Sequence, residues 1–154
     1  MGRAQQDQSK KDERDTGRSD PFRQSSVVPY RIINAGVEIM MITSIRRRRW
    51  IIPKGAVEPD MTPQDSAAKE AFEEAGIIGS VSKTPIGRYH YKKWSDICRC
   101  DVYAMKVETI LETWQEQEER EREWIEAKDA ISRLRHKQLK AIVKKFINNP
   151  IDWP

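Results

Sequence analysis

The segment from Thr62 to Gly76 constrains the fold of this chain more than any other, because both of its ends carry helix-boundary signals. Thr62 is a residue type that caps helix N-termini with its side-chain oxygen, and Pro63 suits the first helical position. Asp65 follows Thr62 at the spacing of a capping box. Gly76 is a natural residue for the left-handed conformation that ends a helix. The sequence therefore predicts one helix between these limits.

The predicted helix has an acidic side and an apolar side. At about 100° per residue, three carboxylates fall within about 100° of one another. They belong to Glu70, Glu73 and Glu74. The residues on the opposite side are Ala68, Ala71, Phe72 and Ala75. We expect this apolar side to pack on a sheet.

The acidic side is expected to bind a cation. Like charges at this spacing destabilise a bare helix by a few tenths of a kcal/mol per pair, and they lie near the helix C-terminus, where the macrodipole disfavours anions. Hard oxygen ligands on a rigid helix suit Mg²⁺ or Mn²⁺, which then hold phosphates and water. The alternative is a solvated acidic face on a surface helix, which would bind no metal.

Strands and helices follow one another in mixed order along the rest of the chain. Strands are predicted at residues 26–33, 37–44, 50–52, 78–91, 97–109 and 123–125. Loops are predicted at residues 53–61 and 112–122, with a turn at Lys92-Lys93. Two further helices are predicted at residues 127–134 and 137–147. This order favours an α/β/α sandwich with a mixed sheet.

The N-terminal segment, residues 1–24, is expected to be a disordered tail. It is rich in Gln, Asp, Ser, Lys and Arg and has a single Phe, so it cannot bury enough apolar surface to offset the entropy of ordering. We expect one domain over residues 25–148 and a short C-terminal tail at residues 149–154. Hydrophobic residues make up 38% of the chain, which suits one modest core.

The chain has a net charge of +4 and a pI of about 9.1. This mild basic excess favours a polyanionic partner, without distinguishing nucleic acid, a membrane or a small phosphorylated ligand. No apolar run reaches the length of a membrane span, and the N-terminus lacks the apolar core of a signal peptide. Cys98 and Cys100 are too close along a strand to form a favourable disulfide. We expect reduced thiols in a cytoplasmic protein.

A glycine precedes the acidic helix at a specific distance. Together they make the segment Gly55 to Ile77 resemble the Nudix box, G-x5-E-x7-R-E-U-x-E-E-x-G-U, where U is a bulky apolar residue. The matching residues are Gly55, Glu70, Glu73, Glu74, Gly76 and Ile77, with the small Ala71 at the first U position. The resemblance implies a Nudix-type fold and a pyrophosphohydrolase that depends on Mg²⁺ or Mn²⁺.

The resemblance also implies roles for individual residues. Glu70 and Glu74 would bind the metal, together with a backbone carbonyl at Lys54-Gly55. Glu73 is the implied catalytic base, as in the diphosphoinositol branch of the family. In other branches the base comes from a later loop, where this chain offers Glu116, Glu118 and Glu119.

Two positions depart from the Nudix pattern. Met61 stands where the family has its first Glu, and Lys69 stands where it has Arg. Those two family side chains are thought to hold the loop against the helix. We expect Glu58 or Asp60 to meet Lys69 instead.

Segments outside the box indicate a substrate class. Residues 49–53, 111–114 and 122–125 are similar to segments of diphosphoinositol polyphosphate phosphohydrolases, whereas Pro53-Lys54-Gly55 resembles diadenosine polyphosphate hydrolases. The first resemblance implies phosphate-binding roles for Thr43, Ser44, Arg120 and Lys137. Arg49 and Lys54 flank the same loop, and basic side chains of this kind grip phosphate oxygens well.

The favoured function is hydrolysis of a pyrophosphate bond in a small substrate of the dinucleoside polyphosphate or diphosphoinositol polyphosphate type. An RNA 5′-end pyrophosphohydrolase is an alternative that the basic excess permits. A non-catalytic Nudix-fold module that binds a nucleotide is another, which the three glutamates disfavour. No membrane partner is expected, and the fold by itself does not fix the substrate.

Overall fold

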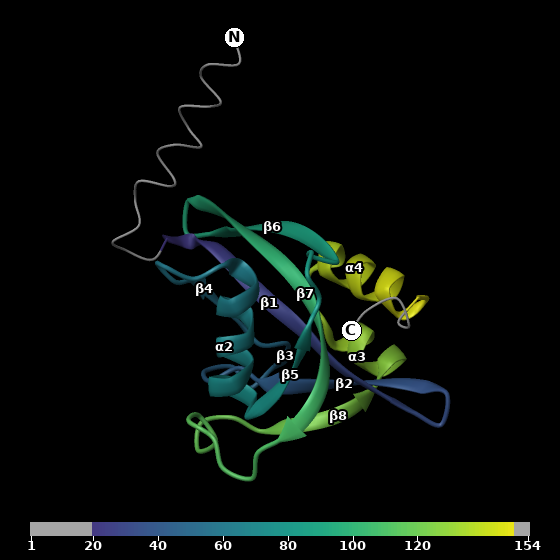
Figure 1. The fold of residues 1–154 in the computed structure, drawn as a ribbon. Helices are drawn as coiled ribbons and strands as arrows, with labels where there is room; N and C mark the ends of the chain where they lie inside the picture. The colour runs from purple at the N-terminus through teal and green to yellow at the C-terminus, as the bar shows by residue number, and fades with distance from the viewer. Residues whose placement is uncertain (1–19, 150–154) are drawn as a thin grey trace.

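An eight-stranded mixed sheet forms the centre of the molecule in the computed structural model, which describes residues 20–149 (Figure 1). The strands are β1 (Asp20–Ile33), β2 (Gly36–Thr43), β3 (Trp50–Ile51), β4 (Lys54–Val57), β5 (Ile77–Val81), β6 (Gly87–Lys93), β7 (Asp96–Ile110) and β8 (Arg122–Glu126). Their main order is β3-β2-β1-β7-β5, and β4, β6 and β8 pair with β1, β7 and β2. β1 and β7 run parallel, and the other pairs within the described range are antiparallel.

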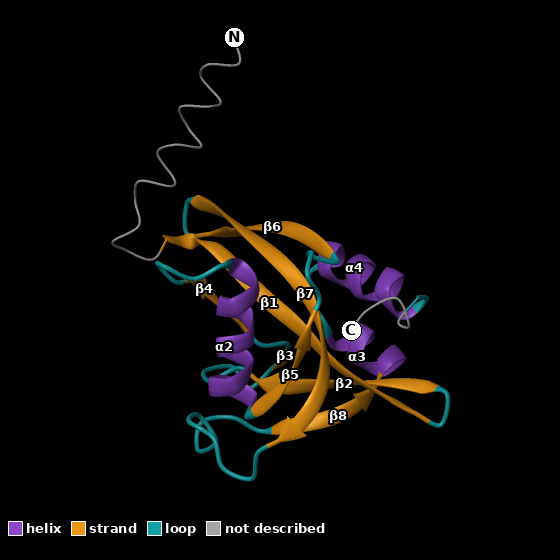
Figure 2. Cartoon of the chain, in the orientation of Figure 1, coloured by secondary structure: helices purple, strands orange, loops and turns teal. Residues whose placement is uncertain are grey.

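Helices cover both faces of this sheet (Figure 2). The helix α2 (Pro63–Ala75) packs on one face, whereas α3 (Ala127–Arg133) and α4 (Lys137–Ile147) pack on the other. Successive residues of β1 point to opposite faces, so Val27 lies in the core under α2 and Val28 lies in the core under α3 and α4. The predicted α/β/α sandwich with a mixed sheet is confirmed.

The first strand begins earlier than the sequence indicates. β1 starts at Asp20 rather than near Ser25, because β4 and β7 supply backbone partners for its first residues. Gln24, expected as the last residue of the tail, is 7% exposed. The rest of the predicted tails, residues 1–19 and 150–154, lies outside the described residues.

Two predicted connections also differ. Residues 54–57 form β4 where the sequence predicts a loop, since Lys54 and Gly55 pair with Ser26 and Ser25 of β1. The strand predicted over residues 78–91 is two strands, β5 and β6, with Pro85 between them. Proline has no N–H to donate to a ladder, which explains the break.

The turn after β6 is displaced by two residues from its prediction. Lys92 and Lys93 are the last residues of β6, and the turn lies at Trp94 and Ser95. Trp94 takes the left-handed conformation there, with φ of 59°. A tight turn between two paired strands requires this conformation, which hydrophobic periodicity does not reveal.

The ends of α2 agree with their prediction. Oγ1 of Thr62 accepts a hydrogen bond from the backbone N–H of Asp65 at 3.0 Å, and Pro63 is the first helical residue. Gly76 ends the helix with φ of 66° and ψ of 41°. Its N–H donates to the carbonyl of Phe72 at 3.1 Å. The limits of this helix are therefore defined by local sequence alone.

Replacing Gly76 with Ala is expected to destabilise the fold by about 1 kcal/mol or more, because the left-handed conformation costs a residue with a Cβ about 1–2 kcal/mol. The new Cβ would also overlap the Cβ of Trp114. Thermal melting should show a fall of about 2–4 °C for each kcal/mol. Gly36→Ala is the matched control, since a Cβ at Gly36 meets only the Ile33 carbonyl, at 3.4 Å. Equal melting temperatures for the two variants would contradict the role of the left-handed cap.

The buried side of α2 is rotated from the predicted one. Its packed residues are Ser66, Ala67, Ala71, Glu74 and Ala75. Phe72, expected on the sheet, is instead 46% exposed. Ala68 is only partly buried against the same core. Small residues let the helix lie close to the sheet, and this orientation turns part of the acidic side toward β4.

Candidate active site

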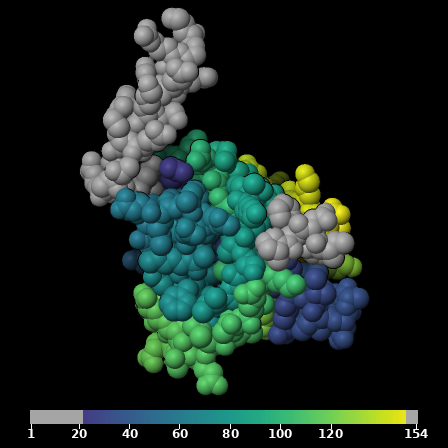
Figure 3. All heavy atoms as spheres, viewed as in Figure 1, coloured from purple at the N-terminus to yellow at the C-terminus, as the bar shows by residue number. Residues whose placement is uncertain are grey.

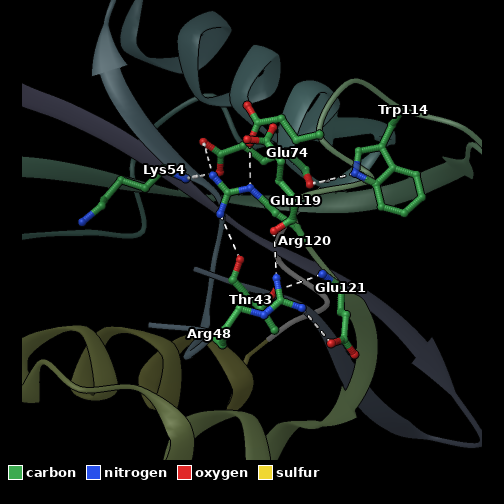
Figure 4. Close-up of polar contacts among 9 residues, drawn as sticks. Thr43, Arg48, Lys54, Glu74, Trp114, Glu119, Arg120 and Glu121 are labelled. Atoms are coloured by element: carbon green, nitrogen blue, oxygen red, sulfur yellow. Dashed lines mark hydrogen bonds and ion pairs between the residues drawn. The ribbon is translucent and has the colours of Figure 1, made fainter. Parts of the chain in front are cut away.

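Lys54 and Gly55 of β4 lie against the acidic residues of α2. The backbone N–H of Lys54 donates to Oε1 of Glu74 at 3.2 Å (Figure 4). A Cβ at Gly55 would overlap the carboxyl group of Glu70 and displace it, so the glycine lets that side chain approach the strand. The contact between β4 and α2 thus brings two predicted metal ligands to the predicted loop backbone.

Burial perturbs the protonation of these two carboxyls. Glu74 is 6% exposed, and burial raises the pKa of its carboxyl to about 9, with a further contribution from its hydrogen bond to Glu70. Burial also raises the pKa of the half-buried Glu70. Two buried carboxyls in contact disfavour joint ionisation, so they retain a proton where an isolated carboxyl would not. A divalent cation bound to both would stabilise the ionised pair.

The donor set at this helix fits a hard divalent cation, because it consists of carboxylate oxygens beside a glycine backbone. Within residues 20–149, no three His, Cys, Asp or Glu side chains are already arranged as a metal site. The carboxylate of Glu73 faces Lys69 instead, with Oε2 2.7 Å from Nζ. Metal binding by all three glutamates therefore requires the side chain of Glu73 to turn from Lys69.

Met61 and Lys69 stand where the Nudix pattern has a paired Glu and Arg. Glu58 here supplies a different acidic partner for Lys69. Nζ of Lys69 lies 2.7 Å from Oε2 of Glu58, as one of the two sequence alternatives predicts. Hydrogen bonds to Glu58 and then to Glu73 raise the pKa of Lys69. Met61 is 36% exposed. The loop before α2 is thus tied to the helix, although a pair this exposed contributes only about 0–1 kcal/mol.

Trp114 and Arg122 close the C-terminal end of α2. Nε1 of Trp114 donates to the carbonyl of Glu74 at 3.0 Å (Figure 4), and Nη1 of Arg122 donates to the carbonyl of Ala75 at 2.8 Å. The Arg122 guanidinium lies 3.8 Å from the centroid of the Trp114 ring. The last turn of α2 has no basic residue of its own, so Arg122 supplies the cation that complements the helix dipole. These contacts fix the turn that carries Glu74.

Arg120 joins the acidic helix to the end of β2. Its Nη2 lies 3.8 Å from Oε2 of Glu74, its Nε lies 2.7 Å from Oε1 of Glu116, and its Nη1 donates to the carbonyl of Thr43 at 3.0 Å. The side chain of Arg120 is only 10% exposed. Its guanidinium therefore acts as a fixed counter-ion beside the buried carboxyls.

The loop over residues 111–121 packs against the lower end of α2 in the view of Figure 3. Of its three candidate bases, Glu116 is bound to the acidic helix, since its backbone N–H donates to the carbonyl of Glu73 at 3.1 Å. Glu118 and Glu119 are exposed. Glu116 is thus the loop alternative to Glu73 that the structure favours.

A cavity of about 740 Å³ opens beside β4, and Lys54 and Gly55 are among its lining residues. Its cationic lining residues are Arg46, Arg47, Arg49, Lys54, Lys93 and Arg135. Its aromatic lining comes from Trp50, Tyr89, Tyr91 and His136. The described lining contains no Asp or Glu. Lys54 and Gly55 of β4 line the cavity and also contact Glu74 and Glu70, so the basic interior of the cavity adjoins the candidate metal ligands.

Lys54 contributes to both parts of the site. Its backbone binds Glu74, whereas its Nζ donates to the Tyr91 hydroxyl at 3.1 Å and lies 4.5 Å from the centroid of that ring. The Tyr91 hydroxyl donates in turn to Oε1 of Gln24 at 3.1 Å. Burial lowers the pKa of Lys54. An ammonium held by neutral groups is well placed to attract an anion.

The residues predicted to bind phosphate fall into two groups. Ser44, Arg49 and Lys54 line the cavity. Thr43 is 3% exposed, and its Oγ1 accepts from the N–H of Glu121 at 2.9 Å, so it holds the loop together. Lys137 is exposed at the start of α4 and is not among the lining residues. Arg120 lies among the carboxylates rather than along the cavity.

Comparison with known proteins decides the family, because the protein-family model described as the NUDIX domain matches residues 23–148 of this chain. The chain belongs to the Nudix family. Nudix hydrolase 12, mitochondrial, from Arabidopsis thaliana is 30% identical over 144 residues, which cover 80% of this chain and 71% of the relative. Diphosphoinositol polyphosphate phosphohydrolase 3-beta from Bos taurus is 36% identical over 108 residues, which cover 68% of this chain and 65% of that relative. The crystal structure of the C. elegans Ap4A hydrolase superposes with a TM-score of 0.68 at 20% identity. The superposition covers 82% of this chain and 96% of the hydrolase.

Membership of the Nudix family confirms the predicted enzyme class, a Nudix pyrophosphohydrolase. The resemblance to both named branches is confirmed by the relatives, although the similarity to the Ap4A hydrolase concerns the fold alone at this identity. No helix within residues 20–149 has the length and apolar character to cross a membrane. The cytoplasmic location stays a prediction, and some Nudix relatives are named mitochondrial.

Several residues of this Nudix site escape sequence reasoning. Arg135 and His136 reach the cavity from the junction between α3 and α4, and the ring of His136 lies 5.2 Å from that of Tyr91. Gln24 of β1 also lines the cavity, although the sequence assigns it to a tail. Their neighbours in space are remote in sequence. The residues of this cavity that the sequence does indicate include Ser44, Arg49 and Lys54, which lie close to the Nudix box along the chain.

Proposed function

We propose that this Nudix hydrolase is a Mg²⁺-dependent pyrophosphohydrolase whose substrate carries several phosphates, as dinucleoside polyphosphates and diphosphoinositol polyphosphates do. The carrying observation is the cavity, whose described lining is rich in cations and has no carboxylate. A polyanion can lie along this lining with one pyrophosphate beside Lys54 and Gly55. The relatives named diphosphoinositol polyphosphate phosphohydrolases and the fold neighbour named Ap4A hydrolase support this substrate class.

The proposed metal ligands are Glu70, Glu74 and the backbone at Lys54-Gly55. A divalent cation, Mg²⁺ or Mn²⁺, supplies charge neutralisation for the pyrophosphate oxygens and makes water more acidic. Glu70 and Glu74 give the carboxylate oxygens, and Gly55 allows Glu70 to approach the strand. Trp114, which hydrogen-bonds the carbonyl of Glu74, keeps that ligand in place.

Glu73 is the proposed base. It accepts a proton from the attacking water, whose oxygen forms a bond to phosphorus while the bridging P–O bond breaks. The departing phosphate carries the new negative charge toward Lys54 and the arginines of the cavity, which stabilise it electrostatically. Glu116 is the alternative base, because Arg120 holds its carboxylate beside the acidic helix.

A panel of pyrophosphate compounds tests the function. It contains a diadenosine polyphosphate, a diphosphoinositol polyphosphate, ADP-ribose and a 5′-triphosphorylated RNA, each with Mg²⁺ or with excess EDTA. We expect Mg²⁺-dependent cleavage of one of the first two, seen as two adenosine phosphates from the dinucleotide or as inorganic phosphate from the diphosphoinositol compound. Faster turnover of RNA would replace the substrate class, full turnover in EDTA would remove the metal role, and binding without turnover would make the chain a regulator.

A further inference from the structure

The β2–β3 loop holds four consecutive arginines, and the structure separates one of them from the others. Arg46, Arg47 and Arg49 line the cavity. Arg48 does not, because its Nη1 donates to the carbonyl of Glu119 at 2.9 Å and its Nη2 lies 2.8 Å from Oε2 of Glu121 (Figure 4). Arg48 therefore anchors the loop, and the other three arginines remain available to a ligand.

The backbone of this loop is fixed by its own hydrogen bonds. The N–H of Ser44 donates to the carbonyl of Arg49 at 2.7 Å, and the N–H of Arg49 donates to Oγ of Ser44 at 3.0 Å. The N–H of Arg48 donates to the carbonyl of Ser44 at 3.1 Å, with Arg48 in the left-handed conformation. The guanidinium groups thus start from a pre-organised backbone, which reduces the entropy lost when they bind an anion.

Arg135 lines the same cavity from the helical layer formed by α3 and α4. It lies between α3 and α4, where Leu134 is 6% exposed and the ring of His136 packs 5.3 Å from that of Tyr89. The charge of Arg135 lowers the pKa of Arg49, with smaller contributions from burial and from Arg47. Two elements remote in sequence therefore bring guanidinium groups to one cavity, and the described lining of that cavity has no carboxylate.

We propose that Arg47, Arg49 and Arg135 form a second anion subsite, which binds a phosphate of the substrate other than the pair that is cleaved. This inference rests on the proposed function and deepens it. Like charges held together in a cavity repel one another, and a phosphate between them relieves that repulsion through charge-assisted hydrogen bonds. Arg135 belongs to the layer opposite α2, so the subsite lies apart from the candidate metal ligands.

Binding without metal tests the subsite separately from catalysis. Inorganic tripolyphosphate is titrated calorimetrically into the full chain in EDTA. We expect Arg49→Gln and Arg135→Gln each to raise Kd by about tenfold, the loss of one charge-assisted contact. Arg135→Lys should recover only part of the affinity, because a guanidinium grips phosphate with two donors. Lys128→Gln, at an exposed position of α3, is the charge-matched control and should bind like the wild type.

Turnover supplies the second arm. On a substrate with four phosphates, Arg135→Gln is expected to raise KM by about tenfold with kcat nearly unchanged, whereas ADP-ribose, with two phosphates, should not respond to the substitution. Unchanged tripolyphosphate binding in both arginine variants overturns the subsite, as does an equal loss in Lys128→Gln. If the wild type hydrolyses nothing yet the calorimetric differences hold, the proposed function fails and the anion subsite stands.

Discussion

Replacing Glu73 or Glu74 with Gln is expected to lower kcat by about two orders of magnitude or more, in line with the loss of a base or of a charged metal ligand. Gln keeps the shape and the helix propensity of Glu. Glu74 lies against the Lys54 backbone, and Gln can still accept that hydrogen bond. Glu73→Gln removes one partly exposed ion pair with Lys69, which contributes about 1 kcal/mol. Both variants should therefore fold.

Steady-state kinetics with saturating Mg²⁺, together with thermal melting, measures this effect. Glu112→Gln is the matched control, because Glu112 is an exposed glutamate of the neighbouring loop with no proposed catalytic role and should keep the wild-type rate. Glu116→Gln separates the two candidate bases: a pH–rate profile that loses its acidic limb in Glu116→Gln alone would move the base from Glu73 to the loop. Wild-type kcat in both Glu73→Gln and Glu74→Gln would remove the metal assignment.

The parts of the fold that sequence predicts are those set by local chemistry. The limits of α2 follow from Thr62, Pro63 and Gly76, whose conformational preferences act over a few residues. β4 depends on pairing with β1, and residues 54–57 carry no strand pattern of their own. The prediction that Phe72 packs on the sheet is wrong for a related reason, since Phe72 is exposed. Helical periodicity gives two sides, and only the neighbouring strand decides how the helix is rotated.

The candidate site divides in the same way. The spacing of the three glutamates and Gly55 identifies the acidic cluster. Charge alone suggests Glu58 or Asp60 as the partner of Lys69, and the folded chain selects Glu58. The burial of Glu74 and its contact with Arg120 depend on three segments that meet only in the folded chain. The cavity depends on Arg135 in the same way. Sequence therefore finds the chemistry of this site better than its electrostatic surroundings.

The metal-free protein is expected to lose stability as pH rises from about 5 to 9, and Glu74→Gln should reduce that loss. Burial raises the pKa of Glu74 to about 9 in the folded state, above its ordinary value of 4.5. The folded state then binds a proton that the unfolded chain has released. The stabilisation is complete below the unfolded pKa and is lost as pH rises through the folded pKa, at a rate on the order of 1 kcal/mol per pH unit.

Melting curves in EDTA at pH 6, 7 and 8 measure the effect for the wild type, Glu74→Gln and the surface control Glu112→Gln. The Tm of Glu74→Gln should fall less steeply with pH, because Gln keeps the contact with Lys54 and has no proton to lose. Lys54 and His136, whose pKa values are lowered chiefly by burial, respond in the opposite direction in every variant. The difference between variants therefore isolates Glu74.

Mg²⁺ should raise the wild-type Tm more at pH 8 than at pH 6, since a ligand that takes the place of the shared proton binds more tightly when protons are scarce. Parallel pH dependences for wild type and Glu74→Gln would mean that Glu74 is ionised in the metal-free fold, with Arg120 as its counter-ion.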